Sequence, residues 1–74
     1  MAEYRIDVMQ DASPHAKVIH SEWFTARSTG GACQKAGRIL DRNATAGDQY
    51  GDLWMRDPDG GTQAEYVDTI SQEI

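Results

Sequence analysis

Apolar and polar side chains alternate over residues 3–9 of the chain. Tyr4, Ile6 and Val8 fall on one side of an extended backbone, and the arginine and aspartate between them fall on the other. A period of two that includes β-branched and aromatic residues is typical of a strand buried on one side. The pattern therefore predicts a first strand over residues 3–9, with its apolar side facing a core.

A turn and a second strand are predicted next. The run Asp11-Ala12-Ser13-Pro14 favours a turn, because proline fixes its own φ and the Asp and Ser side chains bond to nearby backbone. Residues 16–26 then carry β-branched and aromatic side chains, among them Trp23 and Phe24. This composition predicts a second strand that pairs back on the first.

A helix is predicted after Ser28, whose hydroxyl can accept a hydrogen bond from a backbone N–H two or three residues later. The segment contains three glycines, each of which costs a helix up to ~1 kcal/mol relative to alanine. A helix that tolerates this cost is held by packing, so we expect it to lie against a sheet and to end within residues 43–47. The apolar positions with helical spacing are Ala32, Cys33, Ala36, Ile39 and Leu40.

Two more strands are predicted in the second half of the chain, over residues 50–56 and 62–70. In the first of these, Leu53 and Met55 fall on the side opposite Tyr50, Asp52 and Trp54; the second contains Tyr66, Val67 and Ile70. Between them, the run Asp57-Pro58-Asp59-Gly60 suits a type I turn followed by a glycine bulge. The two strands are therefore expected to form a second hairpin.

Together these elements predict an α+β fold of order ββαββ, with one helix on one face of a four-stranded antiparallel sheet. The chain has 74 residues, which is enough for one domain and no more, so residues 1–74 are expected to form a single domain. Ordinary ligand pockets occupy roughly 300–1,000 Å³, and a chain this short has little room for one. Length therefore argues against a self-contained metabolic enzyme.

The chain is acidic, and its charged residues are unevenly distributed along the sequence. The formal net charge is −5. Residues 1–40 hold four acidic and five basic side chains, whereas residues 41–74 hold eight acidic and two basic ones. Binding to nucleic acid needs clustered Lys and Arg, and no such cluster occurs, so direct binding to nucleic acid is not expected. The acidic half either meets a basic protein surface or keeps the chain soluble.

The cysteine content and the hydrophobic pattern indicate in which cellular compartment the protein is expected. Cys33 is the one cysteine of the sequence, which excludes an intrachain disulfide and a multi-cysteine zinc site and fits a reducing compartment. The start of the chain lacks the basic and apolar regions of a signal peptide. No segment approaches the ~20 apolar residues of a membrane span. We therefore expect a cytoplasmic protein with no membrane partner.

Four groups of residues are candidate chemical sites, and none favours catalysis. His15 and His20 do not have zinc-ligand spacing, and Cys33 near a helix start could be an activated thiol but is more simply a small buried residue. The run Ser28–Gly31 lacks the lysine of a phosphate-binding loop. A calcium loop over Asp57, Asp59 and Glu65 is incomplete. We expect a protein that is not an enzyme and has no metal or cofactor.

The aromatic residues point instead to a binding surface. If the helix covers the sheet face that bears Tyr4, Ile6, Val8, Phe24, Leu53 and Met55, the opposite face bears Ile19, Trp23, Tyr50 and Trp54, with Asp52 and Arg56 beside them. Trp, Tyr and Arg are enriched at binding hot spots, because they bury much area at modest entropy cost. The alternative is that a bulge in the second strand turns Trp23 inward.

In its size, its hairpin-helix-hairpin order from Tyr4 to Ile70 and its acidic half from Asp41, the whole chain resembles small orphan proteins of phages and mobile elements, such as anti-CRISPR inhibitors. The resemblance implies an inhibitor that binds a larger protein or complex and blocks its basic, nucleic-acid-handling groove. Acidic side chains would stand where phosphates sit: Asp48, Asp52, Asp57, Asp59, Glu65 and Asp68. The predicted partner-binding residues are Trp23, Tyr50, Asp52, Trp54, Arg56, Asp57, Asp59, Glu65, Tyr66 and Asp68. The alternative is a small homodimeric regulatory or assembly protein.

Overall fold

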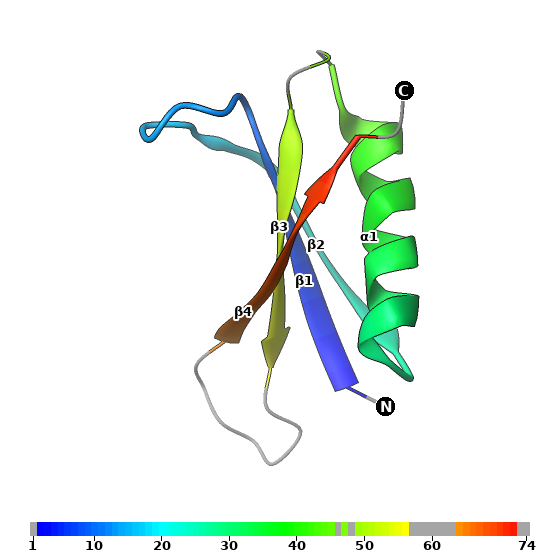
Figure 1. Ribbon diagram of the computed structural model, residues 1–74. Helices are drawn as coiled ribbons and strands as arrows, with labels where there is room; N and C mark the ends of the chain where they lie inside the picture. Colours follow the sequence, from blue (N-terminus) through cyan, green and yellow to red (C-terminus); the bar gives the residue numbers. More distant parts are fainter. Residues whose placement is uncertain (1, 46, 48, 57–63, 73–74) are drawn as a thin grey trace.

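A computed structural model describes residues 2–45, 47, 49–56 and 64–72. Its elements, in chain order, are β1 (Ala2–Met9), β2 (Val18–Ala26), α1 (Thr29–Asn43), β3 (Tyr50–Arg56) and β4 (Ala64–Ser71). The strands form a four-stranded sheet of order β2-β1-β3-β4 in which every neighbouring pair is antiparallel (Figure 1). The predicted α+β fold of order ββαββ is confirmed.

The helix α1 packs on one face of the sheet, and no other described element covers the opposite face (Figure 1). Because β2 and β3 flank β1, the chain passes over β1 through the helix between these two strands. Apolar side chains from both layers meet between helix and sheet, and small residues let the layers approach. The core consists of Tyr4, Ile6, Val8, Ala26, Ala32, Ala36, Ile39, Leu40 and Leu53.

Both ends of the helix are stabilised by hydrogen bonds. The Oγ of Ser28, the residue before the helix, accepts a bond from the Gly31 N–H at 3.1 Å, which confirms the predicted N-cap. At the other end the Ala44 N–H donates to the Leu40 carbonyl at 2.8 Å. The Asn43 side chain also donates to the Ile39 carbonyl at 2.8 Å, so carbonyls of the last turn are partly satisfied.

Two register shifts decide which side chains share a face of the sheet. Between β1 and β2 the register is regular from Ala2 to Val8, which lies opposite His20, and then shifts so that Met9 lies opposite Val18. The extra residue is Ile19, so Trp23 keeps its regular place opposite Arg5 and is not turned toward the core. A second shift occurs in β4 around Val67.

The remaining differences from the expected elements are small. The second strand begins at Val18, since the hairpin is closed before it by a hydrogen bond from the Gln10 N–H to the Lys17 carbonyl at 2.9 Å. In the predicted turn, the Ser13 N–H donates to Asp11 Oδ1 at 2.8 Å. The fourth strand begins at Ala64 and ends at Ser71. The turn predicted at residues 57–60 lies outside the described residues.

Candidate partner-binding face

The face of the sheet opposite the helix carries a row of aromatic and arginine side chains that spans all four strands. Arg5 on β1 lies opposite Trp23 of β2 on one side and Trp54 of β3 on the other. Trp54 in turn lies opposite Tyr66 of β4. We call these four residues, together with Arg56 of β3, the open-face cluster.

The members of the open-face cluster contact one another closely. The guanidinium carbon of Arg5 lies 5.5 Å from the ring centre of Trp23 and 5.6 Å from that of Trp54. Arg56 reaches across β1 to place its guanidinium carbon 4.5 Å from the Trp23 ring centre. The rings of Trp54 and Tyr66 meet edge to face at 5.6 Å. These contacts hold two cations against aromatic rings, an arrangement favoured by the negative potential of the ring faces.

Part of the open-face cluster is accessible and part is fixed in place. Trp23 is 43% exposed and Tyr66 is 54% exposed, whereas Trp54 between them is half-buried. The Arg5 Nε lies 3.0 Å from Asp7 Oδ1, an ion pair that is not aligned as a hydrogen bond. Within the described part of the chain, the buried Trp54 Nε1 also finds no hydrogen-bond acceptor. The cluster therefore presents exposed rings that are already oriented by their neighbours.

Two carboxylates lie in the next row of the same face. Asp7 of β1 is opposite Asp52 of β3. The Ser21 hydroxyl donates to Asp7 Oδ1 at 2.8 Å, and Thr69 lies 3.5 Å from Asp52 Oδ1. Burial raises the pKa of Asp52 above its usual value and the charge of Asp7 raises it further, while the hydrogen bond from Thr69 lowers it. This row gives the face a negative region directly beside the aromatic row.

The structure brings together six of the ten residues predicted to bind a partner. They lie on the open face: Trp23, Tyr50, Asp52, Trp54, Arg56 and Tyr66. Glu65 lies opposite Met55, and Asp68 lies opposite Leu53, so these two exposed acids project on the helix side of β4. Asp57 and Asp59, as well as Asp48 of the predicted acidic surface, lie outside the described residues.

Sequence reasoning missed Arg5 and Asp7 as members of this face. The alternation of β1 places both of them opposite its apolar residues, which was a usable signal. Their importance depends on β1 lying between β2 and β3, and the order of strands in the sheet does not follow from periodicity. Arg5 can contact two tryptophans only because it stands on a central strand.

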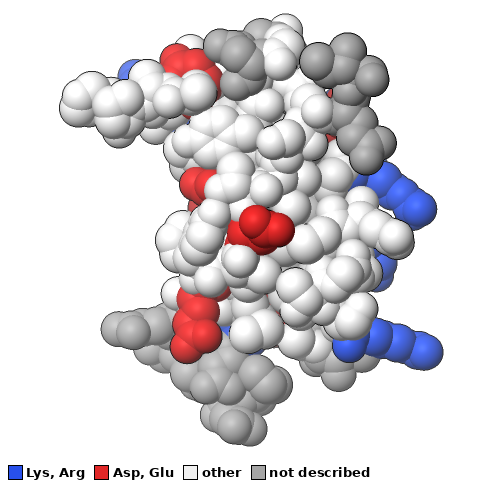
Figure 2. Space-filling model, in the orientation of Figure 1, with Lys and Arg blue, Asp and Glu red and all other residues white. Residues whose placement is uncertain are grey.

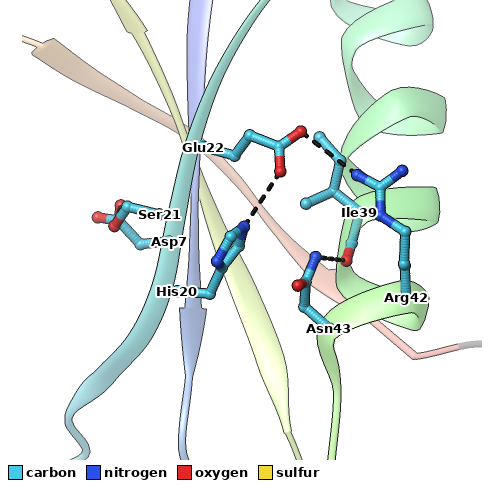
Figure 3. A network of polar contacts seen from close by, with 7 residues as sticks. All are labelled: Asp7, His20, Ser21, Glu22, Ile39, Arg42 and Asn43. Carbon is cyan, nitrogen blue, oxygen red and sulfur yellow. Dashed lines mark hydrogen bonds and ion pairs between the residues drawn. The ribbon is translucent and has the colours of Figure 1, made fainter.

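The surroundings of His15, His20 and Cys33 are those of structural residues. Figure 3 shows His20 beside Glu22, with its Nε2 3.1 Å from Glu22 Oε1, and Arg42 Nη2 of the helix 3.4 Å from Glu22 Oε2. Burial, followed by the charge of Asp68, raises the pKa of the Cys33 thiol, which is the opposite of what an activated nucleophile needs. His15 is exposed in the loop between β1 and β2.

Metal sites, membrane-spanning helices and cavities are the other features that could carry a function. No group of three or more His, Cys, Asp or Glu side chains among the described residues is placed to hold a metal ion. The same part of the chain contains no helix of the length and apolarity needed to cross a bilayer. A shallow cavity of about 460 Å³ lies between α1 and β4, lined by Cys33, Gln34, Gly37, Arg38, Asp41, Thr69, Ile70 and Ser71. It brings no convergent set of catalytic groups together.

Charged side chains are spread over the molecule. Figure 2 shows Lys and Arg projecting on the side of the helix, at the right, and Asp and Glu in separate places over the sheet side. In this view the acidic groups do not join into one continuous patch. No single acidic surface is therefore seen from this side of the molecule.

Comparisons with known proteins give no family. The chain matches no family model, no curated protein and no solved structure. No residue role can be carried over from a relative, and the resemblance to phage inhibitors stays a prediction.

Proposed function

We propose that this chain is a non-enzymatic protein-binding module and that the open-face cluster is its contact surface. The observation that supports this is the row Trp23–Arg5–Trp54–Tyr66, which lies on a sheet face left uncovered by the described residues. Trp, Tyr and Arg are enriched among the hot spots of protein interfaces. Because neighbours already orient the rings and guanidinium groups, little side-chain entropy is lost on binding.

The charges of the face favour a protein over a nucleic acid. Exposed aromatics on a sheet can stack with bases, but such platforms work together with a cationic groove that follows the phosphates. Here the two arginines share the face with Glu3, Asp7 and Asp52. Phosphates next to the Asp7–Asp52 row would be repelled, whereas a protein surface can offer apolar and basic groups together.

The Asp7–Asp52 row and the exposed rings beside it indicate which groups a partner surface would carry. We propose that the partner presents Lys or Arg toward Asp7 and Asp52 and packs apolar or aromatic side chains against Trp23 and Tyr66. A groove that handles nucleic acid has this basic character, so inhibition of such a complex is a form of the same proposal. If the partner is such a complex, Asp52 contacts its basic groove directly. Glu65 and Asp68, on the helix side of β4, lie outside the contact.

Capture of partners from a lysate of the source organism tests the proposal. The immobilised full chain is compared with Trp23→Ala and Tyr66→Ala, and bound proteins are identified by mass spectrometry. Removal of a hot-spot side chain costs about 2 kcal/mol or more, so we expect recovery of the specific partner to fall more than about tenfold.

The matched control is Asp68→Asn, which alters an exposed side chain on the opposite side of β4 and should leave capture intact. Circular dichroism verifies that each variant is folded. A partner captured equally by the wild type and by both aromatic variants would refute the role of the open-face cluster. Failure of the wild type to retain any protein above background would refute the binding function itself.

A further inference from the structure

Among the described residues, no strand pairs with the outer edge of β2. In the order β2-β1-β3-β4, β2 ends the sheet on one side and β4 ends it on the other. β2 has nine residues, and three of its large apolar residues are substantially exposed: Val18 at 49%, Ile19 at 42% and Trp23 at 43%. A long edge with free N–H and C=O groups and exposed apolar side chains is a template for pairing with another strand.

The two edges of the sheet differ in how they are protected. β4 is interrupted by the register shift around Val67 and exposes the acidic side chains of Glu65 and Asp68. Bulges and charged residues are devices that discourage pairing at an edge. β2 contains no proline and no lysine, and its one formally charged residue, Glu22, is already in contact with His20 and Arg42 (Figure 3). β2 also carries a register shift, at Ile19, but this lies near the start of the strand and the pairing is regular from His20 to Ala26. The shift in β4 falls in the middle of that strand, so β2 is the less protected of the two edges.

We propose that a second copy of this chain pairs with β2 in antiparallel fashion about a two-fold axis through Ser21. Residues that lie opposite each other in an antiparallel pair have their side chains on the same face of the sheet, whereas successive residues of one strand point to opposite faces. A two-fold axis perpendicular to the sheet must therefore pass between two copies of the same residue. With Ser21 at the axis, His20 lies opposite Glu22 of the second copy. Ile19 lies opposite Trp23 of the second copy, which joins two exposed apolar side chains.

Neighbouring registers are less complementary. An axis through Glu22 would set the two Glu22 carboxylates opposite each other, and like charges in that position are destabilising. An axis through His20 would place the two imidazoles together and leave Ile19 opposite Ser21. Beyond the proposed paired segment, Lys35 Nζ donates to the Thr25 carbonyl at 2.8 Å and already occupies a backbone acceptor there. The axis at Ser21 is the register in which charge and apolar exposure both match.

The pairing would form about six new backbone hydrogen bonds, two for each bonded pair of residues. It would also join the two sheets into one, with both helices on one side and both open-face clusters on the other. Two contact surfaces in a single rigid face would let the dimer engage a repetitive or two-fold partner by avidity. This assembly goes beyond the proposed function and does not depend on it.

Disulfide trapping tests the register. In a Cys33→Ser background, Ser21→Cys places two thiols opposite each other across the axis. The Cα atoms of opposite residues in an antiparallel pair are ~4.5–5.5 Å apart, within the range that a disulfide spans. We expect mild oxidation at micromolar protein to give a covalent dimer about tenfold faster than for Thr25→Cys, an exposed position of the same strand that lies off the axis.

Light scattering after size exclusion tests the dimer without cysteines. The wild type should have the mass of a dimer, and His20→Glu should shift it toward monomer, because it sets two acids opposite each other. The exchanged variant His20→Glu with Glu22→His should restore the dimer. A monomeric wild type, or equal trapping at Ser21→Cys and Thr25→Cys, would overturn the proposal. A dimer that persists in His20→Glu but is lost in Trp54→Ala would assign the interface to the open face instead.

Discussion

Asp7 and Asp52 lie directly opposite each other on adjacent strands of the open face. Asp7 is paired with Arg5 at 3.0 Å, whereas no described cation is recorded in an ion pair with Asp52, which has a hydroxyl of Thr69 as its polar contact. Burial and the neighbouring charge of Asp7 both raise the pKa of Asp52. The fold therefore keeps an acid at a place that disfavours its ionised form.

The first prediction concerns Asp52→Asn and the pH dependence of stability. Because the pKa of Asp52 is higher in the folded than in the unfolded chain, the folded state binds more protons, and stability decreases as pH rises through this pKa. Removing the charge should raise the free energy of unfolding at pH 7 by roughly 0.2–1 kcal/mol, because like charges directly opposite are destabilising and cross-strand pair effects have this size. The gain should vanish at acidic pH, below the ordinary pKa of Asp.

Urea unfolding of wild type and variant at several pH values checks this. Asp68→Asn is the matched control, since Asp68 projects from the helix side of β4. An Asp52→Asn variant that is less stable than wild type at neutral pH would contradict the assignment of unfavourable burial and repulsion to this carboxylate.

The fold could be predicted because each element carries a consistent pattern. In β1, Tyr4, Ile6 and Val8 alternate without interruption, and all three are buried. In α1, Ala32 and Ala36 recur with helical spacing and both lie in the core. Local pattern and tertiary packing agree in these segments, so periodicity alone gives the correct layer for each residue.

The composition of the open face could be predicted only in part, and β4 shows why. A regular strand would place Tyr66 and Asp68 on the same face. The register shift around Val67 instead leaves Tyr66 opposite Trp54 and turns Asp68 to the side of Leu53. A bulge reverses the alternation after it, and nothing in the local sequence marks Val67 as the extra residue. Strand order, which brings Arg5 between two tryptophans, is likewise a tertiary property.

The second prediction is that Gly51→Ala destabilises the sheet. A Cβ at Gly51 would overlap Cδ1 of Ile6 and lie 3.1 Å from its Cγ1. Ile6 is fully buried, so its side chain has no free space into which to move. Overpacking of this kind costs about 1–3 kcal/mol, and for a domain of this size 1 kcal/mol lowers the melting temperature by about 4–8 °C. Thermal unfolding followed by circular dichroism measures the shift.

The third prediction is that Gly37→Ala, in the middle of the helix, has the opposite effect. A Cβ there would meet only Cγ2 of Ile70, at 4.0 Å, which is an ordinary van der Waals contact. Replacing a helical glycine by alanine reduces the entropy of the unfolded chain and stabilises by about 0.5–1 kcal/mol. The same thermal unfolding experiment should show a higher melting temperature. A decrease would mean that the gap between α1 and β4 is tighter than this contact indicates.

The last prediction concerns the reactivity of Cys33. The thiolate is the reactive form, and burial together with the charge of Asp68 raises the thiol pKa, so less thiolate exists at neutral pH. We expect the folded chain to react with iodoacetamide more slowly than the same chain in denaturant. Asp68→Asn removes one of the two causes and should accelerate the reaction of the folded form, whereas Asp7→Asn, on the opposite face of the sheet, should not. A folded chain that reacts as fast as the unfolded one would contradict the half-buried position of Cys33 against the core.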